Sequence, residues 1–182
     1  MNEIRSIIGP DRPLHIQVTA LDTEGMLRDA DTLLSKVDPE VYVKVPVTME
    51  GIKAIKQMKA RGIHVTGTAI YGKQQGFLAM EAGADYIAPY FNRMENMGLD
   101  SDDVIASLAD MIDLYHYDTQ ILAASFKNAG QIDRAFLAGA HTATMDPSIL
   151  KDVLTQPYIT NAVDTFDSDW KTIFGDQTIS EL

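Results

Sequence analysis

The sequence predicts an α/β fold of the TIM (β/α)8-barrel type in which only six βα units are present, followed by C-terminal helices. Short runs rich in β-branched residues begin 21 to 36 residues apart, and helix-patterned stretches separate them. This alternation is typical of right-handed βα units in a parallel sheet. The six runs are Leu14–Ala20, Val41–Val47, Ile63–Ala69, Ala84–Tyr90, Gln120–Phe126 and His141–Met145.

The alternation ends after Met145. We therefore expect one partial barrel domain over 1–182, with 147–182 as its helical C-terminal extension. Pro147 and Pro157 suit the first turn of two helices. An apolar row on the second helix either closes the end of the barrel or grips a neighbouring subunit, and both interpretations remain open. The row consists of Ile159, Val163, Phe166, Trp170 and Phe174.

Residues that cap helices mark the starts of three earlier helices. Thr48, Ser101 and Asn128 each precede an apolar pattern with helical spacing and can accept a hydrogen bond from the first turn. We expect each of them to be an N-cap.

Composition excludes several classes of protein. The net charge of −11 and the absence of cysteine disfavour non-specific nucleic-acid or membrane binding, a disulfide framework and thiolate chemistry. No apolar run has the length of a membrane span, and the polar N-terminus does not resemble a signal peptide. We expect a cytoplasmic protein. A closed eight-unit barrel needs about 250 residues, so 182 residues are few for that fold.

Strand alternation singles out Lys44. In Val41–Val47 the four valines share one face, and Lys44 lies on the opposite face with Tyr42 and Pro46. The valine face suits burial beneath helices, which turns the lysine toward the barrel interior. Such a lysine is either structural, snorkelling from an edge strand or paired with a buried carboxylate, or functional, with a lowered pKa. A free amine can form a Schiff base with a carbonyl.

The same alternation brings polar residues of five strands to one interior. Gln17, Lys44, Thr68, Tyr90 and Ser125 could all face inward, at or near the C-terminal ends where barrel active sites lie. This convergence favours an active site.

Cationic and hydroxyl side chains follow the strands at the same end. Arg93, Ser125 and Lys127 together suit a phosphate monoester, although Arg93 and Lys127 could also be ordinary exposed loop charges.

Other chemistries lack support. The sequence contains no Gly-rich nucleotide loop and no GxSxG elbow, and its four histidines lack metal-ligand spacing. We favour packed, hydrogen-bonded roles for His15 and His64.

Four motifs resemble the fructose-6-phosphate aldolase and small transaldolase family. They are VKVPVT (Val43–Thr48), GTAIYG (Gly67–Gly72), AGADYIAPYFNR (Ala82–Arg93) and LAASFK (Leu122–Lys127), and Asp169–Gly175 is similar too. The resemblance implies a barrel enzyme of the class I aldolase type that needs no metal or organic cofactor. It also implies ring-like homo-oligomers, often decamers, acting on sugar phosphates and dihydroxyacetone.

The resemblance assigns roles to the candidate residues. Lys44 matches the Schiff-base lysine, and Tyr90, Gln17 and Thr68 match residues around the catalytic water. Arg93, Ser125 and Lys127 match positions that bind the phosphate of the acceptor aldehyde. Transaldolases of the family usually carry glutamate in place of Gln17 and phenylalanine in place of Tyr90, so both positions are of the aldolase type.

The N-terminal part departs from the family pattern. The motifs correspond to units three to eight, and the first strand with its aspartate and the TTNPS-like motif are absent. Six strands cannot close an eight-strand barrel, so we expect two unpaired edges. We expect cleavage and formation of fructose 6-phosphate. The alternatives are a transaldolase and a catalytically impaired, truncated remnant that acts as an interaction subunit.

Overall fold

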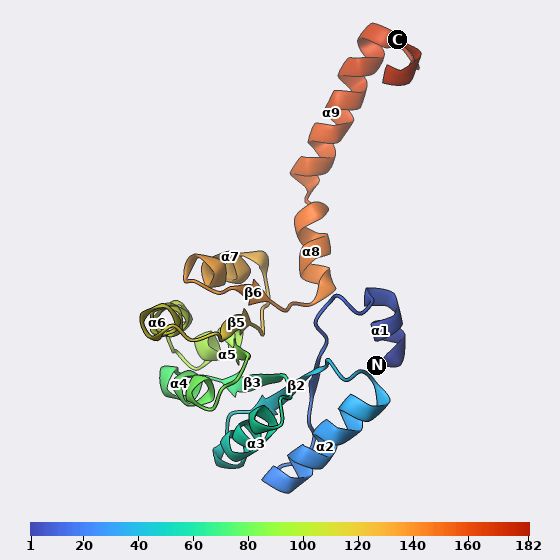
Figure 1. The fold of residues 1–182 in the computed structure, drawn as a ribbon. Helices are drawn as coiled ribbons and strands as arrows, with labels where there is room; N and C mark the ends of the chain where they lie inside the picture. Colours follow the sequence, from blue (N-terminus) through green and yellow to red (C-terminus); the bar gives the residue numbers. More distant parts are fainter. The chain divides into compact units, whose positions relative to one another are not determined.

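The computed structural model describes residues 1–182, which divide into two compact units, Met1–Met145 and Asp146–Leu182. The first unit is an open half-barrel. Its six parallel strands follow one another in sequence order, and helices cover the outer face of the curved sheet (Figure 1). The strands are β1 (His15–Gln17), β2 (Tyr42–Pro46), β3 (Val65–Ile70), β4 (Tyr86–Pro89), β5 (Gln120–Ala123) and β6 (Thr142–Ala143).

Seven helices belong to this unit. A short helix precedes the sheet, and the others connect successive strands. They are α1 (Asn2–Ile8), α2 (Thr23–Lys36), α3 (Met49–Ala60), α4 (Lys73–Glu81), α5 (Phe91–Asn96), α6 (Ser101–Tyr115) and α7 (Ala129–Leu137). The predicted fold class and the unpaired edges, β1 and β6, are confirmed.

All six strands are shorter than the predicted runs, and β5 shows one reason. The run Gln120–Phe126 pairs as a strand only to Ala123, because Ser125 has a φ of 65° and its backbone is left-handed. One isolated bridge between Tyr90 and Ala124 continues the pairing. Ser125 therefore lies in a loop just beyond the strand, and alternation along β5 does not determine where its side chain points.

The valine face of β2 is confirmed as core. Val41, Val43 and Val45 are fully buried, and helices α2 and α3 pack on this strand. Burying one such side chain stabilises the fold by about 1.5–3 kcal/mol, so this face holds β2 firmly in register.

Pro46 lies inside the sheet without breaking a hydrogen bond to β3. The Val47 amide donates to the carbonyl of Thr68 in β3, and the Val43 amide donates to that of His64, just before β3. The Tyr42 amide donates to the carbonyl of Leu14 on the β1 side. The Pro46 nitrogen therefore faces β1, whose pairing with β2 ends two residues before Pro46, at Gln17 and Lys44. A proline is tolerated where the ladder has already ended.

Two of the three predicted N-caps are confirmed. Thr48 accepts a hydrogen bond from the Gly51 amide, and Asn128 accepts one from the Gln131 amide. The prediction for Ser101 is wrong, because Asp100 caps α6 and Ser101 is the first residue of the helix. A carboxylate is favoured there, since its charge also interacts with the helix dipole.

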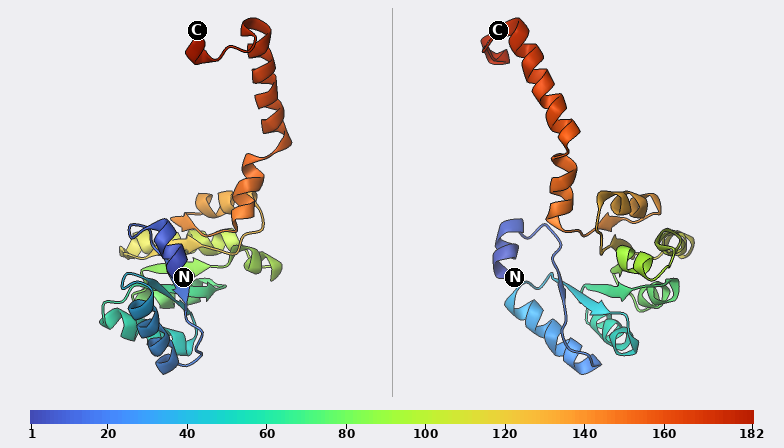
Figure 2. Two further views of the ribbon diagram at one scale, coloured as in Figure 1. Left: turned by 90° about the vertical axis from the view of Figure 1, so that its right-hand side faces the viewer. Right: turned by 180° about the vertical axis from the view of Figure 1, so that it is seen from behind.

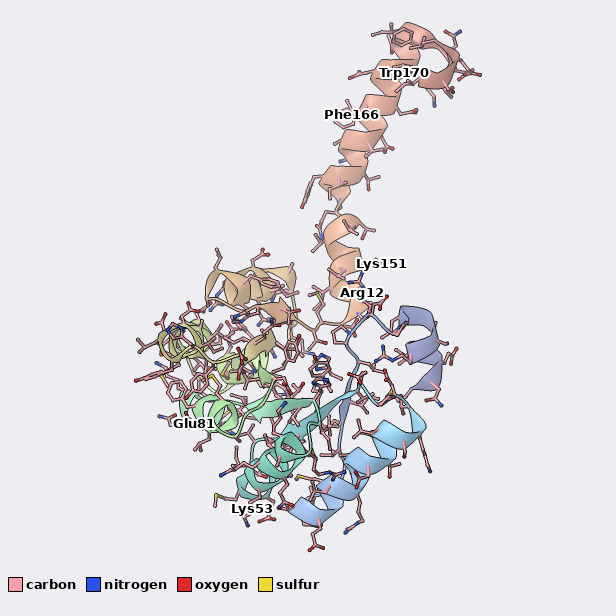
Figure 3. The ribbon with its side chains drawn as sticks, viewed as in Figure 1. Arg12, Lys53, Glu81, Lys151, Phe166 and Trp170 are labelled. Atoms are coloured by element: carbon pink, nitrogen blue, oxygen red, sulfur yellow. The ribbon has the colours of Figure 1, made fainter.

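The second unit contains α8 (Pro147–Leu154), α9 (Pro157–Phe174) and a 3-10 turn, η1 (Ile179–Glu181) (Figure 2). Both prolines lie in a first helical turn, as predicted. No residue of α9 is buried, and Phe166 is 69% exposed. Phe166 and Trp170 are labelled on this helix in Figure 3. No helix in the chain combines the length and apolar character needed to cross a membrane.

The contact between α3 and β2 yields a stability prediction. A Cβ atom on Gly51 would lie 1.8 Å from the carbonyl oxygen of Pro46, and neither backbone can yield cheaply. We expect Gly51→Ala to lower the free energy of unfolding by about 3 kcal/mol, measured by urea denaturation. The control is Gly130→Ala in α7, where the nearest atom is 3.3 Å away. A similar loss in both variants would contradict the prediction.

Candidate active site

Lys44 occupies the second strand of the sheet, between β1 and β3, with Gln17 and Thr66 as its strand neighbours. Its half-buried side chain lines a cavity of about 520 Å³ together with His15 and Tyr86. No carboxylate lines this cavity, and Lys44 makes no ion pair or hydrogen bond. Of the two outcomes considered for a strand lysine, the structure therefore has the unpaired one. Burial lowers the pKa of Lys44 below its ordinary value.

An aromatic cluster of His15, Tyr42, His64 and Tyr86 lies along the same inner face. The His15 ring stacks on Tyr42 at 4.8 Å and meets the edge of Tyr86 at 5.0 Å. Its Nδ1 forms a 2.8 Å hydrogen bond with the Thr66 hydroxyl, which links β1 to β3 across β2. Burial, and secondarily the Lys44 charge, lower the pKa of His15 to about 4. The packed, hydrogen-bonded placement expected for His15 is present in the structure.

Two predicted site residues meet at the carboxyl ends of β3 and β4. The Thr68 hydroxyl and the Tyr90 phenol are 3.1 Å apart and hydrogen-bonded. Thr68 is fully buried, and Tyr90 directly precedes α5. The pair can hold a polar group, such as a water molecule, at a fixed position beside the inner face.

Arg93 packs against this pair from α5. Its guanidinium lies 4.7 Å from the centre of the Tyr90 ring and donates a 3.1 Å hydrogen bond to the Tyr71 hydroxyl. Tyr71 in turn meets Tyr90 edge to face at 5.6 Å. Tyr71 is not among the residues selected from the sequence, although it follows β3 just as Lys127 follows the run that contains β5.

Ser125 and Lys127 lie in the loop after β5. The Ser125 carbonyl accepts a 2.9 Å hydrogen bond from the Asn92 amide, so this loop is tied to the start of α5. The Lys127 side chain is exposed. The three residues expected to bind phosphate thus lie on α5 and on the loop after β5, which a backbone hydrogen bond joins.

The structure does not link every candidate residue to the Thr68–Tyr90 pair. The Gln17 side chain is exposed on the edge strand and makes no hydrogen bond to the Thr68–Tyr90 pair. Lys44 makes no hydrogen bond to that pair either. No cluster of three or more histidine, aspartate or glutamate side chains is placed to hold a metal ion.

Comparisons with known proteins point to one family. The profile of the family described as transaldolase/fructose-6-phosphate aldolase matches residues 1–179. A Streptococcus pneumoniae (strain ATCC 700669 / Spain 23F-1) protein named "Probable fructose-6-phosphate aldolase" is 45% identical over 179 residues, covering 98% of this chain and 81% of that protein. A Chelativorans sp. (strain BNC1) protein named "Probable transaldolase" is 38% identical over 160 residues, covering 88% of this chain and 73% of that protein.

The lowered pKa of His15 predicts a pH dependence of stability. Between pH 6.5 and about pH 4 the unfolded chain binds a proton at His15 that the folded chain does not. The free energy of unfolding should therefore fall as the pH falls through this window, and His15→Phe should make the fall smaller by about 2 kcal/mol, allowing for solvent screening.

The measurement is urea denaturation at pH 7 and pH 4. The control is His116→Asn, which removes an exposed imidazole from a left-handed position that asparagine tolerates. Equal pH dependence in wild type and His15→Phe would refute the prediction.

Proposed function

Because the chain belongs to the transaldolase/fructose-6-phosphate aldolase family, we propose that it is a class I aldolase. In this proposal it cleaves fructose 6-phosphate into dihydroxyacetone and glyceraldehyde 3-phosphate, or forms it from them. The observation that carries the proposal is Lys44, a half-buried strand lysine without a counter-charge, lining a cavity on the inner face. Its lowered pKa raises the fraction of free amine, which is the nucleophile in Schiff-base formation.

Lys44 Nζ attacks the ketone carbon of the sugar phosphate, and loss of water gives a protonated Schiff base. The bond between C3 and C4 then breaks as the C4 hydroxyl loses its proton. The electron pair moves into the iminium, glyceraldehyde 3-phosphate leaves, and an enamine remains. Protonation of the enamine carbon and hydrolysis of the imine release dihydroxyacetone and free Lys44. The iminium is the electron sink, so the route needs no metal or organic cofactor.

The remaining candidates take supporting roles in this proposal. The Thr68–Tyr90 pair, bonded at 3.1 Å, would hold the water that exchanges protons with the intermediates, with Gln17 contributing from β1. Arg93, Ser125 and Lys127 would bind the phosphate. On a chain of net charge −11, such local cations are needed to offset the general repulsion of an anionic substrate.

A transaldolase is the second candidate, because one relative carries that name. It would pass the dihydroxyacetone unit to a second sugar phosphate instead of releasing it. Tyr90 and Gln17 favour the aldolase, since a tyrosine-held water suits protonation and release of the three-carbon unit.

We further propose that the protein forms homo-oligomers. The uncovered apolar row on α9, in which Phe166 is 69% exposed, supports contacts with another copy. Analytical ultracentrifugation would test this, and a monomer at micromolar concentration would contradict it.

The Schiff base gives the first test of the reaction. Borohydride reduction in the presence of dihydroxyacetone should attach a three-carbon adduct to Lys44, detected by peptide mass spectrometry. Lys44→Met should abolish this adduct, while the far-UV circular dichroism spectrum stays similar. An adduct that persists in the variant would mean that another lysine is the nucleophile. No adduct on the wild type would favour the impaired remnant, an interpretation that the open edges of the sheet also support.

The choice between the two reactions gives the next test. We expect cleavage of fructose 6-phosphate alone to be at least as fast as transfer of its three-carbon unit to erythrose 4-phosphate. Tyr90→Phe removes the hydroxyl bonded to Thr68 and should lower cleavage about tenfold. Transfer that outpaces cleavage in the wild type would overturn the aldolase assignment.

A further inference from the structure

Two βα loops of the half-barrel contain the same hydrogen-bonding arrangement around a glutamine, 56 positions apart in the sequence. After β3, Ala69 has a left-handed φ of 57°, and the amide of Tyr71 donates to Oε1 of Gln75 at 2.9 Å. The Nε2 of Gln75 donates to the carbonyls of Val47 and Ala69, at 3.1 and 3.2 Å. The glutamine thereby ties its own loop to the end of β2.

The second copy follows β5. Ser125 has a φ of 65°, and the amide of Lys127 donates to Oε1 of Gln131 at 2.7 Å. The Nε2 of Gln131 donates to Oδ1 of Asn92 at 3.0 Å and to Oε2 of Glu95 at 2.5 Å. This glutamine ties its loop to α5, which follows β4.

This arrangement requires a backbone conformation that costs free energy. A left-handed backbone disfavours residues other than glycine, and both loops place one at the same step before the glutamine. Each glutamine amide uses both of its N–H groups and its oxygen. Gln131 is 7% exposed, so losing these partners would leave polar groups buried and unsatisfied.

The loops held in this way carry or contact the groups expected to bind phosphate. Gln131 joins the backbone of Lys127 to Asn92 and Glu95, the residues that flank Arg93 on α5. Gln75 holds Tyr71, whose hydroxyl accepts the hydrogen bond from Arg93. Glu95 is itself fixed by a 2.6 Å ion pair with Arg134. The two cations have no direct link. Backbone hydrogen bonds from Phe91 and Asn92 to Ala124 and Ser125 join the loop to α5, and the glutamine amides add side-chain contacts that set the spacing of the cations.

We propose that Gln131 and Gln75 are positioning residues that set the spacing between Lys127 and Arg93 and thereby select phosphorylated acceptors. This inference rests on the part of the proposed function that assigns phosphate binding to these loops. Gln131 holds the lysine loop against α5, and Gln75 holds the tyrosine that orients the arginine.

The test compares Gln131→Met with Gln74→Met in the full chain. Methionine keeps the length of glutamine and removes its hydrogen bonds, and Gln74 is an exposed neighbour of Gln75 that makes none. The probe is glycerol 3-phosphate, with affinity measured by titration calorimetry. We expect Gln131→Met to weaken binding about tenfold and Gln74→Met to leave it unchanged. Asn92→Ala, which removes one acceptor and keeps the Gln131 side chain, should weaken binding less.

A second measurement separates positioning from general damage. In Gln131→Met the KM for glyceraldehyde 3-phosphate should rise about tenfold, while the KM for unphosphorylated glyceraldehyde and the trapping of dihydroxyacetone on Lys44 stay near wild type. Equal rises in both KM values, or unchanged glycerol 3-phosphate affinity in both Gln131→Met and Asn92→Ala, would overturn the inference. So would a wild type that does not bind glycerol 3-phosphate. Failure of trapping in the wild type would instead overturn the proposed reaction, and the binding comparison would still decide the role of Gln131.

Discussion

The alternation of side chains along β2 is the constraint on which the rest of the structure depends. Three fully buried valines pack one face of the strand against α2 and α3. The ammonium of Lys44 therefore lies on the other face. A lysine so placed cannot turn outward without pulling valines from the core. The valine packing therefore holds Lys44 on the inner face, where the burial of its own side chain lowers the pKa of the amine.

A second constraint comes from the carboxyl ends of the strands. Residues there must leave the sheet within a few positions, and the backbone does so at Ser125 by adopting a left-handed conformation. Hydrogen bonds from buried amides, such as that of Gln131, then fix loops that would otherwise move. Barrel proteins place their chemistry at this end because rigid strands hold the loops, and here part of that rigidity comes from side chains of the following helix.

Much of the fold could be predicted from the sequence, because it depends on local patterns. The six βα units, the valine face and the caps at Thr48 and Asn128 follow from periodicity and from residue type. Ser101 rather than Asp100 is the predicted N-cap of α6, because the two residues are adjacent and both residue types can cap a helix. The end of β5 was also predicted too late, since only the left-handed backbone at Ser125 shows that pairing stops.

The candidate site could be predicted in part. Alternation placed Lys44 inward, and the meeting of Thr68 with Tyr90 agrees with the expected convergence. The contacts of Tyr71 and Gln131 could not be foreseen. A buried glutamine near a helix start resembles any polar residue of a first turn, and its partners lie up to 39 positions away. Such long-range hydrogen bonds leave no periodic signal in the sequence.

The two open edges have a consequence for how copies of the chain behave together. β1 and β6 present backbone N–H and C=O groups without strand partners, and exposed edges of this kind promote aggregation. The charge of −11 opposes it, because copies repel one another at neutral pH. That repulsion disappears near the isoelectric point of about 4.6 and is screened by salt. At neutral pH the acidic composition therefore opposes association between the exposed edges of this six-stranded sheet.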